Sequence, residues 1–252
     1  MHNEGFSIRI NSVDNPINSI QMTTRISTFG NELNWLDLTP INKPPLPGSF
    51  GVVFLAQIKE SHKIVAVKII KSALVGEIAL SNLQNEARTL KKAADGNMND
   101  YVVKLIGIAQ GPASRAWLDI LDIHGPTLVV GKTKDMIALV MSYEGGGNLG
   151  DLLHKNPLGK WPALTPERLR LILEIVTGLF HLHNNTEGKI IHGDIKPENV
   201  LLSGTGKDSE VSHVRLADFG LSKLISSASR SSSGMSMLQQ ANMARGTPNY
   251  VS

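Results

Sequence analysis

The hydrophobic pattern in the first half of the chain is that of short β-strands. Segments 52–57 and 64–70 consist of strand-forming residues, and the polar stretch 59–63 between them is typical of a turn, so the two are expected to form a hairpin. Two further strand-like segments follow at 102–108 and 137–143. The first half of the chain is therefore predicted to be rich in β-structure.

One predicted helix interrupts this series of strands. Between residues 78 and 93 the apolar positions recur at helical spacing, as at Leu83, Ala87 and Leu90. Glu86 lies one helical turn before Leu90 and shares its side of the helix. The pattern therefore predicts an amphipathic helix that carries a carboxylate beside its apolar face.

A second helix is predicted from residue 166 onward. Thr165 supplies a capping hydroxyl, Pro166 suits the first helical position, and Glu167 places an acid in the first turn. The expected buried stripe of this helix consists of Ile172, Ile175, Val176, Leu179 and Phe180. Because strands come first and helices second, the order of elements indicates the α+β class with two lobes.

The character of the sequence divides the chain into three parts. Residues 1–40 are rich in Asn, Ser and Thr with weak periodicity, and they are expected to form a flexible N-terminal extension. Residues 41–144 carry the strands, whereas residues 145–252 begin with a Gly-rich break and carry the second helix. Residues 110–135 are too long for an ordinary connection between strands, which indicates an insertion whose role the sequence does not suggest.

Composition and charge exclude several classes of protein. The 252 residues have a net charge of +3 with dispersed Lys and Arg residues, which argues against a nucleic-acid-binding surface. The absence of cysteine excludes disulfides, thiolate chemistry and Cys-ligated metals. No apolar segment is long enough for a membrane span and the first residues do not resemble a signal peptide. The expected location is therefore the cytoplasm, with the nucleus as an alternative.

A Gly-rich turn between the first strands is a candidate phosphate site. It consists of Gly48, Ser49, Phe50 and Gly51. Glycines let backbone amides approach a phosphate because no Cβ intervenes. The competing interpretation is a simple hairpin turn, which is the more frequent role of such glycines, and Leu46 stands where a full phosphate loop would begin with glycine.

Lys68 lies in an otherwise apolar strand. Strand alternation allows it to face solvent, as an ordinary surface lysine does. Alternatively, if the predicted helix packs on the sheet, Lys68 can pair with Glu86 and hold its ammonium group beside the phosphates of a ligand. These two residues do not decide between the alternatives by themselves.

Segment 190–202 concentrates the candidate catalytic chemistry. Asp194, Lys196 and Asn199 lie within six residues, between apolar runs, and Asp218 follows the next strand-like run. Asn199 and Asp218 offer the hard oxygen ligands that Mg²⁺ uses beside a nucleotide. Asp194 offers a carboxylate toward a hydroxyl, and Lys196 a counter-charge for a transferring phosphoryl group. The alternative is a pair of surface turns, because Pro and Asp are common turn residues.

Taken in order, these motifs resemble those of a eukaryotic protein kinase. Val65-Ala66-Val67-Lys68 is similar to the strand that carries the nucleotide lysine. His192-Gly193-Asp194 through Asn199 is similar to the catalytic loop, and Asp218-Phe219-Gly220 to the metal-binding triplet. The resemblance covers roughly residues 41–252. It implies a bilobal fold with a small β-rich N-lobe that carries one helix and an incomplete helical C-lobe.

The resemblance also implies a role for each matching residue, with ATP and Mg²⁺ as cofactors. The implied catalytic residues are Lys68 at the α- and β-phosphates with its partner Glu86, Asp194 at the acceptor hydroxyl, and Lys196 near the γ-phosphate. The implied Mg²⁺ ligands are Asn199 and Asp218. The implied nucleotide-binding residues are Gly48, Ser49, Phe50, Gly51, Val53, Ala66, Lys68, Met141, Tyr143 and Leu201. The implied regulatory column of stacked side chains is Leu90, Leu105, His192 and Phe219.

Two details of the resemblance imply the class of acceptor. Lys196, two residues after Asp194, is similar to serine/threonine kinases, and Thr247 in a Gly-Thr-Pro segment matches the same type. The implied partner is therefore a protein with a serine or threonine acceptor. The sequence gives no indication of the oligomeric state.

The chain departs from the family pattern at three places. Leu46 replaces the first glycine of the phosphate loop. Gly193 replaces the arginine on which an activation-loop phosphate often docks, so that charge-assisted switch is missing. The sequence ends before the family's Ala-Pro-Glu element, so the kinase domain is expected to be truncated at its C-terminus. The apolar faces of residues 167–183 and 199–202 are then expected to be partly uncovered.

Two alternatives to an active protein kinase follow from these departures. The first is a pseudokinase-like binding module that holds nucleotide without turnover, which the truncation favours and the intact set of polar residues opposes. The second is a small-molecule phosphotransferase. It is the weaker alternative, because the segment Gly246-Thr247-Pro248-Asn249-Tyr250 suits a loop that binds a protein substrate.

Overall fold

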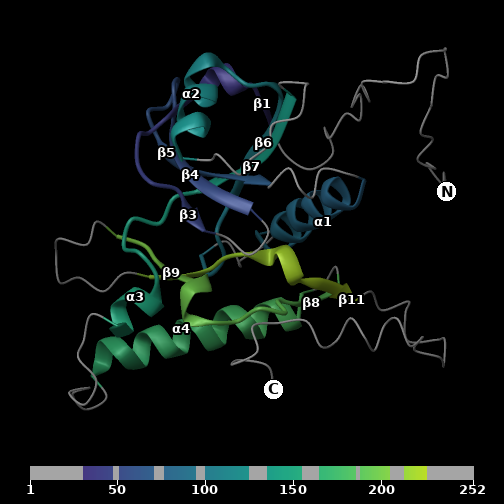
Figure 1. Cartoon of the computed structure of the whole chain (residues 1–252). Helices are drawn as coiled ribbons and strands as arrows, with labels where there is room; N and C mark the ends of the chain where they lie inside the picture. Colours follow the sequence, from purple (N-terminus) through teal and green to yellow (C-terminus); the bar gives the residue numbers. More distant parts are fainter. Residues whose placement is uncertain are drawn as a thin grey trace, which may run out of the picture.

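The computed structural model describes eight segments of the chain, which fold into two lobes (Figure 1). The described residues are 31–47, 51–70, 77–94, 100–124, 135–154, 165–185, 188–204 and 213–225. An N-lobe built around a β-sheet lies above a C-lobe of helices and short two-stranded sheets. This arrangement confirms the α+β, bilobal fold that the sequence implied.

A seven-stranded sheet forms the N-lobe, in the order β1-β6-β7-β5-β4-β2 with β3 paired to β4. Its strands are β1 (Asn31–Leu33), β2 (Leu38–Pro40), β3 (Leu46–Pro47), β4 (Gly51–Ile58), β5 (Ile64–Ile70), β6 (Leu105–Pro112) and β7 (Asp135–Ser142). The predicted hairpin is confirmed, since β4 and β5 pair antiparallel around a turn in which His62 has φ 55°. Only the pairing of β1 with β6 is parallel among the described strands.

The expectation of a flexible extension up to residue 40 is wrong for its described part. Residues 31–40 form β1, the 3₁₀ turn η1 (Trp35–Asp37) and β2, all within the N-lobe. Trp35 is fully buried, and its indole Nε1 donates to the carbonyl of Met136 at 3.2 Å. The content of Asn, Ser and Thr made this segment look like an extension in the sequence. Its strands could not be recognised locally, because β1 pairs with β6, which lies far along the chain.

The insertion contains a second helix of the N-lobe, α2 (Arg115–His124), at the end of the sheet far from the C-lobe (Figure 1). Trp117 is buried there, and its indole Nε1 donates to the Leu38 carbonyl at 3.0 Å. Its ring packs edge-on against Trp35 with the ring centroids 5.1 Å apart. The described N-lobe therefore has two helices where the sequence implied one. Helix α2 is held on the sheet because it shares a hydrophobic cluster with β2.

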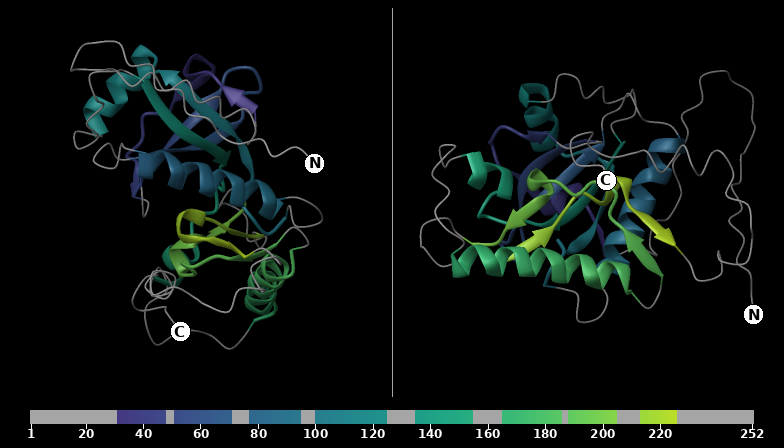
Figure 2. Two further views of the ribbon diagram at one scale, coloured as in Figure 1. Left: turned by 90° about the vertical axis from the view of Figure 1, so that its right-hand side faces the viewer. Right: turned by 90° about the horizontal axis from the view of Figure 1, so that it is seen from below.

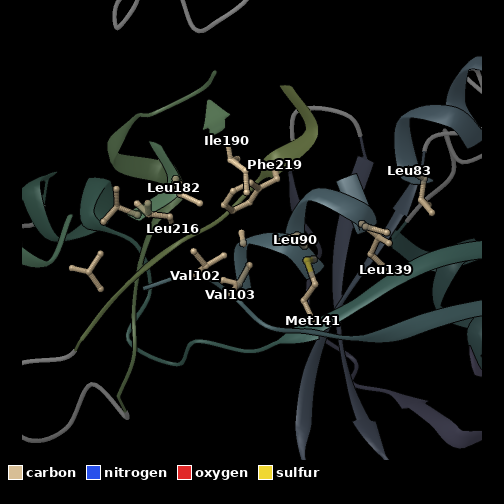
Figure 3. Packing of buried hydrophobic residues seen from close by; sticks show 14 of the residues in the cluster. Leu83, Leu90, Val102, Val103, Leu139, Met141, Leu182, Ile190, Leu216 and Phe219 are labelled. Carbon is tan, nitrogen blue, oxygen red and sulfur yellow. The ribbon is translucent and has the colours of Figure 1, made fainter. Parts of the chain in front are cut away.

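Helix α1 (Glu77–Ala94) lies between the sheet and the C-lobe (Figure 2). Its residues Leu83, Ala87, Leu90 and Ala93 are buried, which confirms the predicted amphipathic helix. They belong to a cluster that extends from Leu139 and Met141 of β7 to the C-lobe (Figure 3). The C-lobe members that Figure 3 labels are Leu182, Ile190, Leu216 and Phe219. One core therefore joins the two lobes.

The described C-lobe carries two helices and two small two-stranded sheets. Its elements are α3 (Leu149–His154), α4 (Pro166–His183), β8 (Lys189–Ile191), η3 (Pro197–Asn199), β9 (Val200–Leu202), β10 (Val214–Leu216), η4 (Phe219–Leu221) and β11 (Lys223–Ile225). Strand β9 pairs with β10, and β8 with β11, both antiparallel. No helix in these described segments is both long and apolar enough to cross a membrane.

Helix α4 begins as the sequence predicted, but its buried stripe is partly wrong. The Thr165 hydroxyl accepts from the Arg168 amide at 3.4 Å, with Pro166 in the first turn. Ile175 and Leu179 pack against the core, whereas Ile172, Val176 and Phe180 are exposed, Phe180 by 62%. The helix is apolar on two sides, and among the described elements only β8 and β10 pack extensively against it. The periodicity alone could not identify which side packs against them.

Candidate active site

Lys68 is buried in the sheet rather than solvated, so the surface interpretation of this residue is wrong. Its ammonium Nζ lies 2.7 Å from Oε1 of Glu86 and 2.8 Å from Oδ1 of Asp218. Both are charge-assisted hydrogen bonds. Lys68 thus joins helix α1 of the N-lobe to the segment that follows β10 in the C-lobe.

The alternation of β5 explains this position. Val65, Val67 and Ile69 point into the cluster around Trp35, so Ala66 and Lys68 face the other side of the sheet. That second side is the one on which α1 supplies Glu86. The sheet and the helix therefore bring the lysine and its carboxylate together by packing alone.

Electrostatics keep Lys68 charged inside the protein. Burial by itself lowers the pKa of Lys68, but Glu86 and Asp218 together outweigh it and raise the pKa above its ordinary value. Burial also raises the pKa of Glu86, and Lys68 opposes that rise. The ammonium group is therefore a fixed positive charge that a phosphate could approach.

A second polar group forms around Asp194 in the loop between β8 and η3. Lys196 places its Nζ 2.9 Å from Oδ2 of Asp194. Asn199 donates from Nδ2 to the same carboxylate oxygen at 3.0 Å and to the Asp194 carbonyl at 2.8 Å. Asp194 and Asn199 are buried, so a simple surface turn does not describe this loop. Its geometry holds one carboxylate between a cation and an amide.

His192 anchors this loop to the segment that carries Asp218. Its Nε2 lies 3.0 Å from the Ala217 carbonyl, which can only accept, so Nε2 carries the proton. Its Nδ1 accepts from the Asp194 amide at 3.4 Å, and its ring lies 4.6 Å from that of Phe219. Burial lowers the pKa of His192, which keeps the ring neutral.

Asp218 and Gly193 have left-handed backbone conformations where the catalytic loop meets η4. Asp218 has φ 62° and ψ 71°, a left-handed conformation that Asp tolerates better than most residues. Gly193 has φ 80°, and a Cβ there would lie 2.7 Å from the Leu221 carbonyl oxygen. Only glycine therefore lets the catalytic loop and η4 approach so closely.

Three of the residues implied for nucleotide binding, Val53, Ala66 and Met141, share the Lys68 side of the sheet. Val53 lies opposite Lys68 across β4 and β5, and Ala66 lies opposite Met141 across β5 and β7. Cross-strand partners face the same side, so these side chains form one surface. The half-buried Leu201 belongs to β9 in the C-lobe, and Tyr143 is partly exposed directly after β7.

The Gly-rich turn is only partly within the described structure. Gly51 begins β4 and is buried, with Ile70 as its cross-strand partner. Gly48, Ser49 and Phe50 lie outside the described residues, as does Thr247. Of the implied regulatory column, Leu90, His192 and Phe219 are buried and Leu105 packs against the same cluster.

Asn199 and Asp218 have the donor chemistry for a magnesium ion. Both hydrogen bonds from the Asn199 side chain to Asp194 use Nδ2, so they do not occupy the side-chain oxygen Oδ1. The Ala217 amide donates to the backbone carbonyl of Asn199 at 2.9 Å, which places the segments of Asn199 and Asp218 in contact. Within the described segments no three His, Asp or Glu side chains gather as a metal site. Asn199 and Asp218 therefore fit a Mg²⁺ ion whose other ligands would be phosphate oxygens and water.

One link in this site was not predicted from the sequence. The pairing of Lys68 with Glu86 was expected, but the second bond, to Asp218, was not. These residues are 150 positions apart, and no local pattern connects them. The only signal in the sequence was that the resemblance implied Lys68 at the phosphates and Asp218 at the Mg²⁺ ion of the same nucleotide.

Comparison with known proteins identifies the family. The family model described as "Protein kinase domain" matches residues 47–252. The chain is 29% identical to zebrafish (Danio rerio) serine/threonine-protein kinase greatwall, over 82% of this chain and 20% of that protein. It is 33% identical to human receptor-interacting serine/threonine-protein kinase 3, over 69% of this chain and 26% of that protein. A shorter match, 42% identical over 37% of this chain, is to a probable inactive receptor kinase of Arabidopsis thaliana, of which it covers 14%. The chain thus spans about a quarter or less of the length of these relatives.

Proposed function

Because the chain belongs to the protein kinase family, we propose that it transfers the γ-phosphoryl group of ATP to a serine or threonine hydroxyl of a protein. The observation that carries this proposal is the contact of Lys68 with both Glu86 and Asp218. It joins the phosphate-binding strand to the metal-binding segment beside the Asp194 loop. Catalysis of this kind depends mainly on positioning and charge neutralisation, which such a cluster supplies.

Each polar residue has a distinct part in the proposed transfer. Lys68 binds the α- and β-phosphates, held in place by Glu86. Asp194 orients the acceptor hydroxyl and takes its proton as the oxygen bonds to the γ-phosphorus. The bond from that phosphorus to the bridging β-oxygen breaks, and ADP leaves. Lys196, bonded to Asp194, lies where it neutralises charge on the transferring group.

A magnesium ion is the implied cofactor of this reaction. Asn199 and Asp218 would hold it, and when bound it would neutralise charge on the phosphates. The remaining nucleotide contacts come from Val53, Ala66 and Leu201 around the base. Met141 lies beside the base in this proposal, as the last buried residue of β7. The Gly48–Gly51 turn covers the phosphates in this proposal.

The proposed acceptor class and location follow from chemistry and similarity. Lys196 follows Asp194 by two residues, and the relatives are named serine/threonine-protein kinases. An ATP-dependent kinase requires the nucleotide pool of the cytoplasm or nucleus, so we place its action there. Its partners are ATP and a protein substrate, without nucleic acid or membrane.

Activity in this proposal does not depend on a phosphate docked at residue 193. Gly193 offers no charge, and its φ of 80° together with the close Leu221 carbonyl leaves no room for a side chain. The contact between the catalytic loop and η4 is made directly by the backbone. The catalytic loop is therefore held by packing instead of by an ion pair at this position.

A second candidate function is nucleotide binding without transfer. The match to a probable inactive receptor kinase favours it. The complete cluster of Lys68, Glu86, Asp194 and Asp218 opposes it, since binding alone does not require a carboxylate at the acceptor. Turnover distinguishes the two candidates.

Transfer of radiolabelled γ-phosphate from ATP to a generic protein acceptor tests the proposal. The Asp194→Asn variant is expected to lose transfer by about 10²–10⁴-fold, because the carboxylate that handles the proton is gone. Asp119→Asn is the matched control, since Asp119 forms an exposed ion pair with Arg115 on α2. Equal transfer by wild type and Asp194→Asn would refute the role of Asp194. Binding of ATP without any transfer would favour the second candidate.

A further inference from the structure

A polar link connects the segment after β7 to the C-lobe behind the candidate nucleotide site. Arg215 of β10 places its Nε 3.2 Å from Oε1 of Glu144. The Ser142 hydroxyl donates to the same carboxylate oxygen at 2.9 Å. The side chains of Glu144 and Arg215 are only 7% and 18% exposed. This ion pair is therefore largely shielded from water, unlike the exposed pair Arg115–Asp119.

The link continues from Ser142 into the segment that leads to β6. The Lys104 amide donates to the Ser142 hydroxyl at 3.0 Å, and the Ser142 amide donates to the Lys104 carbonyl at 2.9 Å. Ser142 thus accepts from one segment and donates to the carboxylate that Arg215 holds. Three segments that are separate in sequence therefore meet around Ser142 and Glu144.

Strand β10, which carries Arg215, is held by backbone hydrogen bonds to two neighbouring segments. Arg215 lies opposite Leu201 in the β9–β10 pair, and the Leu216 amide donates to the Tyr101 carbonyl at 2.8 Å. The Val103 amide in turn donates to the Leu216 carbonyl at 3.0 Å. Leu201 is a base-contacting residue in the proposed function. The strand that holds Glu144 therefore also positions the C-lobe side of the base slot.

Because the Arg215–Glu144 pair is largely shielded from water, removing one partner is expected to displace the other. A shielded carboxylate whose cation is removed keeps its desolvation cost without compensation. Glu144 would then turn toward water, and only a single residue, Tyr143, separates it from Ser142 at the end of β7. The Gly146 amide donates to the Leu202 carbonyl at 2.8 Å and the Leu202 amide to the Gly147 carbonyl at 2.9 Å, so these contacts with β9 would remain. The backbone next to Tyr143 would lose its side-chain anchor on β10.

We propose that Arg215 and Glu144 are positioning residues that hold the backbone around Tyr143 against β9, and so set the width of the slot for the nucleotide base. The inference rests on the proposed function, because it assumes that a purine base enters between this segment and Leu201. The two residues touch neither phosphate nor acceptor. Their effect is therefore confined to recognition of the base.

Adenosine and ATP binding to the full chain, measured by calorimetry, tests this inference. Arg215→Gln and Glu144→Gln are each expected to weaken both ligands by the same factor, about tenfold. Arg215→Lys is expected to restore most of the affinity, because it retains the charge. The double variant is expected to bind no worse than either single variant, since both remove one link. Lys68→Met is expected to weaken ATP but not adenosine.

The kinetics and the controls separate positioning from a general loss of structure. At saturating ATP, the kcat of Arg215→Gln is expected to stay within about twofold of wild type while its KM for ATP rises. Arg115→Gln is the matched control and is expected to change neither constant. Thermal unfolding of each variant shows whether it is folded, and Glu144→Gln provides the test if Arg215→Gln is not folded.

Distinct outcomes overturn the inference or the function beneath it. If adenosine binds a folded Arg215→Gln and a folded Glu144→Gln as tightly as wild type, the link only stabilises the fold and the inference is overturned. An Arg215→Lys variant that is folded but as weak as Arg215→Gln also contradicts it. If wild type binds neither adenosine nor ATP, the proposed function fails and the inference fails with it.

Discussion

Lys68 is held by carboxylates from both lobes, and this single side chain explains much of the site. Glu86 approaches from α1 and Asp218 from the segment after β10, at 2.7 and 2.8 Å. A buried ammonium group needs such partners, because without them it would lose its proton. The same charge that joins the lobes is the one that would face a nucleotide phosphate.

Replacing Gly193 tests the close approach of the catalytic loop to η4. Gly193→Ala is expected to lower the free energy of unfolding by about 2–4 kcal/mol, because it adds left-handed strain and a Cβ overlap with the Leu221 carbonyl. Gly111→Ala is the matched control, since Gly111 has φ 105° but nothing within 4 Å of the added Cβ. Chemical denaturation measures both. Equal losses would contradict the close contact.

His192 makes a pH-dependent contribution to stability. Burial is the largest cause of its lowered pKa; Lys196 adds to the lowering, and the Ala217 carbonyl, Asp218 and Asp194 oppose it. Because the unfolded chain binds a proton at about pH 6.5 and the folded chain does so only at lower pH, stability falls as the pH drops below about 6.5. Relative to wild type, His192→Gln should show a weaker decline between pH 7 and 5 in urea unfolding. Parallel curves would contradict a neutral buried His192.

At the scale of elements, the N-lobe is enlarged by segments on either side of its central strands. Residues 31–40 supply β1, η1 and β2, and the insertion supplies α2. The two tryptophans, Trp35 and Trp117, pack together and donate to carbonyls of distant segments. These additions form a cluster on the side of the sheet opposite Lys68, so they stabilise the sheet without entering the site.

Truncating Trp117 tests this account of the N-lobe. Trp117→Ala is expected to lower the free energy of unfolding by about 3–5 kcal/mol, because it removes a fully buried ring and its hydrogen bond. Ile123→Ala on the same helix is the control, and its effect is expected to stay within about 0.5 kcal/mol since Ile123 is 64% exposed. Similar losses for both variants would show that α2 is not docked on the sheet.

Elements with a strong local pattern could be predicted from the sequence. The hairpin of β4 and β5, helix α1 and the start of α4 all follow from local alternation, helical spacing or capping. The pairing of β1 with β6 and the docking of α2 could not be predicted, because they depend on contacts between distant segments. The packed side of α4 was likewise undetermined, since both of its sides are apolar.

The site shows the same division between local motif and distant contact. The motifs around Lys68, Asp194 and Asp218 identified the candidate residues by their order in the family pattern. The bond between Lys68 and Asp218 and the link from Glu144 to Arg215 have no local signature. Both contacts depend on how the two lobes pack together, and the local sequence pattern does not predict that packing.

At the scale of the whole molecule, one hydrophobic core passes from the sheet into the C-lobe. It includes Leu90 of α1, Met141 of β7 and Phe219 beside Asp218 (Figure 3). Because this core is continuous, the lobes hold Lys68 and Asp218 at hydrogen-bond distance. The central claim is therefore that the packed lobes form one site for a nucleotide with its metal ion.

Magnesium-dependent ATP binding to the full chain tests that claim most directly. Calorimetric titration with ATP, with and without Mg²⁺, should show tighter binding when Mg²⁺ is present. The Asp218→Asn variant should lose most of this magnesium effect, and Lys68→Met should weaken binding under both conditions. Asp119→Asn, which changes only the exposed pair with Arg115 on α2, should behave as wild type. Wild-type ATP binding that is absent, or that is unaffected by Mg²⁺, would contradict the account.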